Sequence, residues 1–142
     1  MAASPGEELV KELMWDKTLS VEVDEIDQDH RRLVDIFNIL NHSVRDGDAS
    51  DYIEAVLEEL VSCTVWHFRH EERLMLKYDY PGFADHKEEH AELIDSAREL
   101  QQKFLQAGKQ LANDDIDFLE VWLTKHILVT DMPLGAYLND VM

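Results

Sequence analysis

Apolar residues recur every three or four positions in four stretches of this chain, which is the spacing of helices that bury one face. No stretch alternates between apolar and polar residues as a half-buried β-strand does. The first helical stretch begins at Ile26 and is interrupted by the polar turn 46–48. Ser50 or Asp51 is then well placed to cap the start of a second helix.

Three further apolar stretches follow, at residues 53–78, 83–104 and 118–127. Residues that disfavour a helix stand after each stretch, and we expect the helices to end there: Pro81-Gly82, Gly108 and Pro133. Before the last stretch, Asn113 and the aspartates behind it suit a cap and a first turn. Four helices of this length with short connections predict an all-α fold, an antiparallel up-down-up-down four-helix bundle.

The chain divides into two parts. Residues 1–20 contain Pro5, Gly6 and one short apolar patch, so we predict an N-terminal arm there. Residues 21–142 then form the four-helix bundle domain. At 142 residues the chain has the size of one domain and can bury a real core.

Composition and charge narrow the classes of partner. The net charge of −18 argues against nucleic acid or an anionic membrane, since both are anions themselves. No apolar run approaches the roughly 20 residues that cross a bilayer, and no export signal stands at the N-terminus, so we expect a cytoplasmic protein. Cys63 is the single cysteine, which excludes an internal disulfide, and we expect Cys63, Trp15 and Trp66 to be packing residues.

Seven residues on the apolar stretches or just beyond them carry metal-binding chemistry: His30, His67, Glu71, His86, His90, His126 and Asp131. His67 and Glu71 are four residues apart, as are His86 and His90, so each pair points from one helix face toward one place. A lone histidine on an apolar face is usually a hydrogen-bonded core residue. Seven such groups would leave many buried polar atoms without partners, at roughly 1–3 kcal/mol each, and metal ions are the natural compensation. Seven ligands suit two ions that share bridging carboxylates.

One pair of candidate ligands does not fit a regular helix. His126 and Asp131 are five residues apart, so an ideal α-helix would turn them roughly 140° away from each other. Both face the core only if the helix widens, as in a π-bulge, or unwinds near its end. Pro133 disfavours helical geometry at the residue before it. We therefore predict an irregular turn around residues 126–132.

The remaining two histidines are not expected to reach this site. His42 follows His30 by twelve residues, which is about 18 Å along a helix, and we expect it at the surface. His70 and Glu72 flank Glu71 in the sequence and so point away from a centre that Glu71 faces. We expect His70 to be solvated or to stand beside the ligands.

Four segments resemble the hemerythrin signature, and in particular that of single-domain bacterial hemerythrins. They are His30-x-x-Leu33, His67-Phe68-Arg69-His70-Glu71-Glu72, Tyr80-Pro81 before His86-Lys87-Glu88-Glu89-His90, and Trp122-Leu123-x-x-His126-Ile127-x-x-x-Asp131. The resemblance covers nearly the whole chain after about Trp15, and all seven candidate ligands match. One departure is that Asp29 stands where a glutamine often precedes the first histidine.

The resemblance implies reversible O₂ binding at a non-haem di-iron centre, by an oxygen carrier, store or scavenger. In that family's arrangement one iron takes three imidazoles and the other takes two: His86, His90 and His126 against His30 and His67. The carboxylates of Glu71 and Asp131 bridge the two ions, Fe²⁺ or Fe³⁺, together with an oxo or hydroxo group. The first iron then has six ligands and the second has five, which leaves one position open for a small molecule.

Four apolar residues beside the ligands match the family's O₂ pocket, although plain core packing also accounts for them: Leu33, Phe68, Trp122 and Ile127. Five neutral imidazoles donate less electron density than a carboxylate-rich set, which favours binding of O₂ over catalysis. Two alternatives stay open. One is a di-iron enzyme with peroxidase, nitric-oxide or nitrite-handling activity, and the other is an oxygen- or iron-sensing module. The sequence identifies no protein partner.

Overall fold

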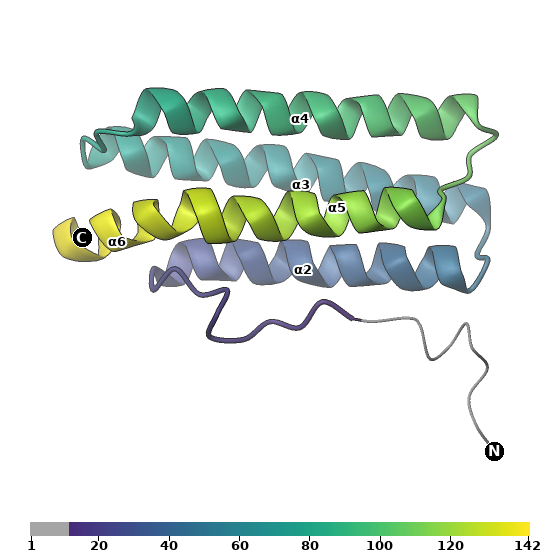
Figure 1. Ribbon diagram of the computed structural model, residues 1–142, viewed down its shortest axis with the longest axis horizontal. Coiled ribbons are helices and arrows are strands. Elements are labelled where there is room, and N and C mark those ends of the chain that lie inside the picture. Colours follow the sequence, from purple (N-terminus) through teal and green to yellow (C-terminus); the bar gives the residue numbers. More distant parts are fainter. Residues whose placement is uncertain (1–11) are drawn as a thin grey trace, which may run out of the picture.

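The computed structural model describes residues 12–142, which form an antiparallel bundle of four helical rods (Figure 1). The helical segments of the described residues are, in chain order, α2 (Asp24–Arg45), α3 (Ser50–Lys77), α4 (Phe83–Gln106), α5 (Asn113–Lys125), the π-helix η1 (His126–Asp131) and α6 (Met132–Val141). The last three are continuous and make up the fourth rod. The described residues contain no strand, and the predicted all-α four-helix bundle is confirmed.

The starts of two helices differ from the predicted caps. Helix α3 begins at Ser50 without a side-chain cap, so neither Ser50 nor Asp51 has that role. At α5, Asn113 is already the first helical residue, and the Asp115 carboxylate accepts the N–H of Ala112 at 2.9 Å. An acid at the third helical position bonds back to the backbone before the helix in this way. The position of the helix was thus predictable, but not which polar residue at its start makes the bond.

The fourth rod does not stop at Pro133, which corrects the prediction. It continues as α6, with Pro133 in the first turn of that helix. In a regular α-helix a proline ring collides with the carbonyl four residues back and leaves it without a donor. In η1 the N–H of Met132 bonds instead to the carbonyl of Ile127, five residues back. The wider turn immediately before Pro133 relieves the collision, and the helix continues.

Residues 12–23, the described part of the chain before α2, form no helix or strand, and they lie against the bundle. The backbone N–H of Leu13 donates to the Asn38 side chain at 2.8 Å, and the Asn38 amide donates to the Leu13 carbonyl at 2.9 Å. Three side chains of this segment are buried in the core: Leu19, Val21 and Val23. The predicted arm also included residues 1–11, which lie outside the described residues.

Gly135 in α6 allows this segment to pack closely. A Cβ atom at position 135 would lie 2.4 Å from the carbonyl oxygen of Val21 and 2.6 Å from the Val21 Cβ. Real Cβ atoms do not approach other atoms so closely, and a backbone carbonyl cannot turn aside as a flexible side chain can. The absence of a side chain at Gly135 is therefore a packing requirement.

Two of the predicted packing residues are less buried than expected. Trp66 is 57% exposed on α3, so its assignment to packing is wrong, and Cys63 is only partly buried. Both line a groove between α2 and α3. Trp15 does pack against the core, and the Arg31 guanidinium lies 5.3 Å from the centre of its ring.

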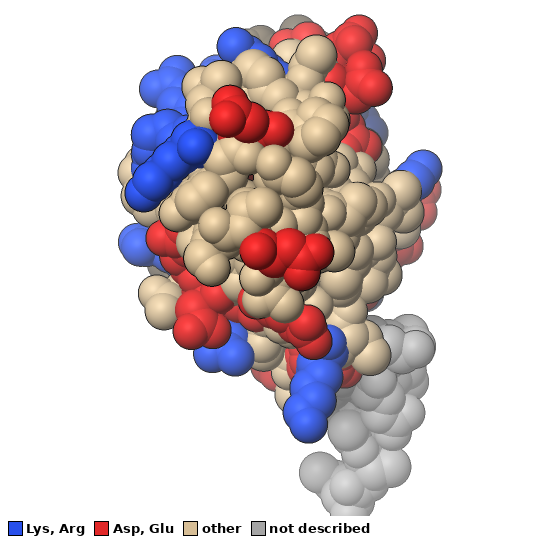
Figure 2. Space-filling view, turned by 90° about the vertical axis from the view of Figure 1, so that its left-hand side faces the viewer, with Lys and Arg blue, Asp and Glu red and all other residues tan. Residues whose placement is uncertain are grey.

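On the end of the bundle in Figure 2, patches of acidic side chains are scattered among larger areas of uncharged residues, and Lys and Arg lie around the edge, mostly at the upper left of the view. Within residues 12–142, no helix combines the length and the apolar character that crossing a membrane requires.

Candidate metal centre

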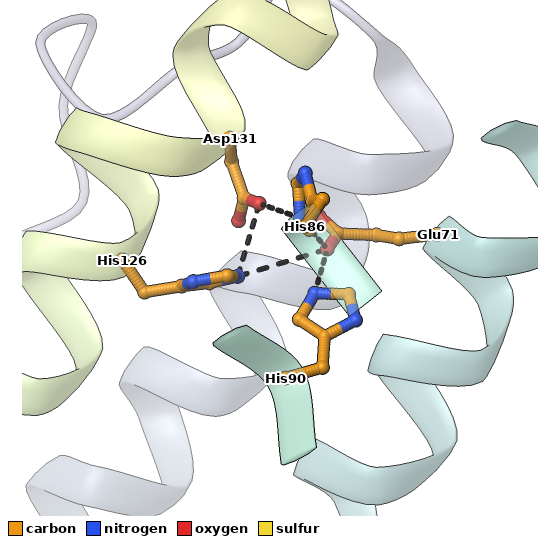
Figure 3. Close-up of side chains that lie close together, drawn as sticks. All are labelled: Glu71, His86, His90, His126 and Asp131. Carbon is orange, nitrogen blue, oxygen red and sulfur yellow. Dashed lines mark hydrogen bonds and ion pairs between the residues drawn. The ribbon is translucent and has the colours of Figure 1, made fainter. Parts of the chain in front are cut away.

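The seven residues that the sequence singled out meet in the core, from all four rods: His30 of α2, His67 and Glu71 of α3, His86 and His90 of α4, and His126 and Asp131 of η1. Each is buried, with at most 5% of its surface exposed. Figure 3 shows five of them pointing toward one another. Side chains separated by up to 101 positions in the sequence therefore share one small volume.

One group of donor atoms combines three imidazoles with one oxygen of each carboxylate. Glu71 Oε1 lies 2.9 Å from Nε2 of His90 and 3.3 Å from Nε2 of His86. Asp131 Oδ1 lies 3.0 Å from Nε2 of His126 and 3.1 Å from Nε2 of His86. The five donors all lie within 4.8 Å of one another. We call this set the three-histidine group.

A second group uses the other oxygen of each carboxylate. Glu71 Oε2 lies 3.2 Å from Nε2 of His67, and Asp131 Oδ2 lies 2.9 Å from Nε2 of His30. These four residues also offer donor atoms within 4.8 Å of one another. We call this set the two-histidine group. Glu71 and Asp131 belong to both groups, each with one oxygen on either side.

The local form of the fourth rod brings His126 and Asp131 together. The π-helix η1 begins at His126 and ends at Asp131. Its wider turn brings Asp131, five positions after His126, back toward the face of His126, which a regular α-helix would not do. The predicted irregular turn around residues 126–132 is confirmed.

Three carboxylates accept hydrogen bonds from candidate ligand histidines, at the ring nitrogen that faces away from the cluster. The sequence analysis did not predict these hydrogen bonds. Each accepts the Nδ1 proton of a histidine: Asp29 from His67 at 2.8 Å, Glu72 from His90 at 2.9 Å and Glu89 from His126 at 3.2 Å. Because Nδ1 is held by the carboxylate, Nε2 is the ring nitrogen that faces the cluster and can ligate a cation. All three acids stand next to a candidate ligand in the sequence, which is the signal that was available. Each one, however, bonds to a histidine on a different helix.

The other two histidines lie where they were expected. His42 is at the surface, with Nε2 2.9 Å from the Glu12 carboxylate. His70 stands beside the cluster, where its Nδ1 bonds to Asp29 at 2.6 Å. Neither joins the two groups of donor atoms.

Several groups of the cluster have pKa values that are shifted from their ordinary values. Burial lowers the pKa of His67, but the Glu71 carboxylate and the hydrogen bond to Asp29 outweigh it and raise the pKa to about 10. Burial also lowers the pKa of His86, and the nearby carboxylates of Asp131 and Glu71 raise it to about 9. Burial raises the pKa of Glu71, yet the surrounding imidazoles hold it well below its usual range. Protons on the imidazoles therefore balance the carboxylates, and cations at the same atoms would displace those protons.

The donor atoms are better placed to coordinate metal ions than to form hydrogen bonds with one another. Nε2 of His30, His67 and His126 and both oxygens of Asp131 make no properly directed hydrogen bond within the described residues, despite their short contacts. Such buried atoms cost roughly 1–3 kcal/mol each. Cations coordinated by these atoms would remove that cost, and imidazole nitrogen with carboxylate oxygen is a set that iron accepts.

A small cavity adjoins the two-histidine group. Apart from His30, His67 and His126, its walls are mainly apolar: Leu33, Thr64, Phe68, Trp122, Leu123 and Ile127. The interior leaves about 10 Å³ for the centre of a water-sized molecule. The four residues that the sequence assigned to an O₂ pocket all line this cavity. Phe68 also stacks on the His90 ring, with centroids 3.9 Å apart.

Fold and site together define a four-helix bundle whose core holds a histidine–carboxylate cluster suited to a pair of metal ions. A family model described as "Hemerythrin HHE cation binding domain" matches residues 21–138. The chain belongs to the hemerythrin family. The resemblance that rested on the sequence motifs is thereby confirmed.

Individual relatives agree with this membership. The chain is 34% identical over 129 residues to the bacteriohemerythrin of Stenotrophomonas maltophilia, and the aligned region covers 91% of this chain and 81% of that protein. It is also 34% identical over 113 residues to the bacteriohemerythrin of Methylococcus capsulatus, with 80% and 86% covered. A crystal structure of wild-type hemerythrin matches with a TM-score of 0.80 at 32% identity and covers 89% of this chain and 97% of its own.

Proposed function

We propose that the protein binds O₂ reversibly at a pair of iron ions and acts as an oxygen carrier, store or scavenger. One observation carries the proposal: Glu71 and Asp131 each direct one oxygen to the three-histidine group and the other to the two-histidine group. Carboxylates in that position are suited to bridge two cations. Membership of the hemerythrin family supports iron as the metal.

The spacing of the donor atoms supports coordination. Two ligand atoms about 2.1 Å from one ion, and at right angles to each other, lie about 3.0 Å apart. The Nε2 atoms of His90, His126 and His30 lie 2.9, 3.0 and 2.9 Å from their nearest carboxylate oxygens. Donors already held at this spacing need little rearrangement to surround an ion.

The two ions would have unequal ligand sets. We assign the ligands as follows: His86, His90 and His126 to one ion, His30 and His67 to the other, and Glu71 and Asp131 to both. When bound, the irons and their oxo or hydroxo bridge supply an open coordination position on the two-histidine side and the electrons that hold O₂. The carboxylates behind the imidazoles keep the Nε2 atoms directed at the ions.

Apolar side chains keep bulk water away from the open position. We propose that four residues, each no more than 7% exposed, form the O₂ pocket: Leu33, Phe68, Trp122 and Ile127. The indole N–H of Trp122 donates to the carbonyl of Leu93 at 3.1 Å, which fixes the ring as a wall of the cavity. A small apolar space of this kind admits a neutral diatomic molecule more readily than a hydrated anion, because the anion would have to shed its water.

Spectroscopy of the iron-loaded protein tests the proposal. Reduced protein prepared without oxygen should be colourless, take on colour when O₂ is added, and lose it again under vacuum over repeated cycles. His30→Ala should abolish the cycle, and His42→Ala, which changes a surface histidine, should leave it intact. Irreversible oxidation in the first cycle, with turnover of peroxide, would contradict reversible binding and favour an enzyme.

A further inference from the structure

One aspartate connects the two-histidine group to a histidine near the surface. Asp29 is on α2, but its Oδ2 atom accepts hydrogen bonds from two side chains of α3, Nδ1 of His67 at 2.8 Å and Nδ1 of His70 at 2.6 Å. Asp29 thus places one carboxylate oxygen behind a ligand of the two-histidine group and shares it with a second imidazole.

The charge of Asp29 acts at short range and with little screening. Its side chain is 12% exposed, and that of His67 is 2% exposed. A hydrogen bond to an ionised acceptor is roughly twice as strong as one between neutral groups, and partly buried charges are screened much less by salt. Aspartate should therefore polarise the His67 ring more than a neutral amide would.

Asp29 is also the one carboxylate behind an imidazole of the two-histidine group within residues 12–142. Nδ1 of His30, the other imidazole of that group, makes no hydrogen bond in this part of the chain. In the three-histidine group, by contrast, Glu72 and Glu89 hold two of the imidazoles. A change at Asp29 thus alters the donor strength on one side of the centre alone.

We propose that Asp29 is a positioning residue that fixes His67 and strengthens its Nε2 as a donor, so that the iron of the two-histidine group is bound more tightly and favours the ferric state. The inference rests on the proposed function. A carboxylate that attracts the Nδ1 proton returns electron density to Nε2, which raises the basicity of the ligand. His70 moderates the effect, because its own N–H takes up part of the charge of the same oxygen.

Titration of the metal-free protein with Zn²⁺ against a competing chelator tests the effect on affinity. We expect two ions per chain, with the affinity of one site about 10–100-fold lower in Asp29→Asn than in the wild type. Asp29→Glu keeps the charge and should restore part of the affinity. Asp35→Asn is the matched control, because Asp35 is an exposed acid of α2 outside the cluster, and it should bind Zn²⁺ as the wild type does.

The midpoint potential of the iron-loaded protein, measured by reductive titration, tests the electronic effect. Asp29→Asn should raise the potential, because the ferric state loses part of its donor strength. His70→Phe should lower it, because Asp29 then bonds to His67 alone. The opposite signs separate an electronic effect from a general loosening of the site. His70→Phe also provides the test if Asp29→Asn does not fold.

Three results would overturn the inference. The first is equal affinity and equal potential in Asp29→Asn and Asp35→Asn, and the second is an unchanged potential in His70→Phe. The third is an additional, third ion per chain that disappears with Asp29, because Asp29, His67 and His70 offer donor atoms within 4.8 Å of one another and would then bind metal directly. A wild-type protein that fails to bind two ions or O₂ would instead overturn the proposed function, and the inference with it.

Discussion

Nε2 of His126 lies 3.0 Å from Oδ1 of Asp131, although the two residues are five positions apart on one continuous rod. The π-helix that makes this contact consists of the segment between these two residues. The π-helix is thus the part of the backbone that brings two of the candidate metal ligands together. Interrupted helical geometry of this kind is frequent at functional sites, since it directs side chains that a regular helix would separate.

The sharing of two carboxylates predicts how the metal content of variants changes. His67→Ala should leave about one iron per chain, because the three-histidine group keeps all its donors. Asp131→Ala should leave less than one, because both groups lose an oxygen. Metal analysis of the folded variants, with His42→Ala as the control at two ions, checks this. Equal losses in the two ligand variants would mean that the carboxylates do not bridge.

The metal-free protein should lose stability as the pH rises. The pKa values of His67 and His86 are raised to about 10 and about 9, so the folded state holds protons that the unfolded chain releases near the ordinary value of about 6.5. The stabilisation is complete below that ordinary value and disappears as the pH rises through the raised values. The melting temperature of chelator-treated protein should therefore be lower at pH 10 than at pH 6.5, and an equal or higher value at pH 10 would contradict the assignment of these protons.

The acids of the cluster should make the metal-free protein lose stability as the pH falls. The pKa values of Glu71 and Asp131 are lowered below their ordinary range, since the charges of the surrounding imidazoles outweigh the effect of burial. Their contribution is present above about pH 4 and is lost as the pH falls through the lowered values. The metal-free protein should thus melt at its highest temperature between about pH 5 and 6.5.

Iron should reverse the alkaline trend. Coordination requires deprotonated imidazoles, so binding releases protons and strengthens as the pH rises. The difference in melting temperature between the iron-loaded and metal-free proteins should therefore widen from pH 6.5 to pH 9. Calorimetry of both forms in the same buffers measures it, and a difference that stays constant would count against metal ligation by these histidines.

Gly135→Ala should destabilise the fold away from the metal centre. The added methyl group would overlap the Val21 carbonyl at 2.4 Å, so the segment before α2 has to shift. Overpacking of this kind costs about 1–3 kcal/mol. Urea unfolding should show the loss, and Asn139→Ala, at an exposed site of the same helix, serves as the control. A free energy of unfolding within about 0.5 kcal/mol of the wild type would mean that the two segments do not pack so closely.

The sequence was most informative where the geometry of a single helix determines which side chains face the core. Helical spacing was enough to place His67 with Glu71 and His86 with His90 on inward faces, because each pair lies on a single helix. The five-residue gap between His126 and Asp131 likewise requires a local irregularity if both side chains are to face the core. Such inferences depend on the geometry of one helix and on the cost of burying polar groups.

Features that depend on how helices meet were not predictable in the same way. Asp29 is on α2, but its carboxylate accepts a hydrogen bond from His67 of α3. That contact depends on the relative register of the two helices, which the spacing of residues within one helix does not reveal. The continuation of the helix past Pro133 depends on the wider turn before it, which periodicity alone does not reveal. Trp66 was expected to be a packing residue, yet it lines the groove between α2 and α3 and is 57% exposed.

Leu33→Ala should distinguish a ligand pocket from ordinary core packing. Leu33 lines the cavity beside the two-histidine group, whereas Leu57 is equally buried, at 2% exposed, and does not line it. Truncation of either leucine should cost about 2–5 kcal/mol. Only Leu33→Ala opens the cavity, so it alone should admit water and reduce the number of reversible oxygen cycles. If both variants cycle like the wild type, the cavity is not the O₂ pocket.

Anomalous X-ray diffraction at the iron edge, from crystals of the iron-loaded protein, tests the central claim most directly. Two peaks are expected, one facing His86, His90 and His126 and the other facing His30 and His67, with the carboxylates of Glu71 and Asp131 extending one oxygen to each. A single peak, or iron bound outside this cluster, would contradict the account.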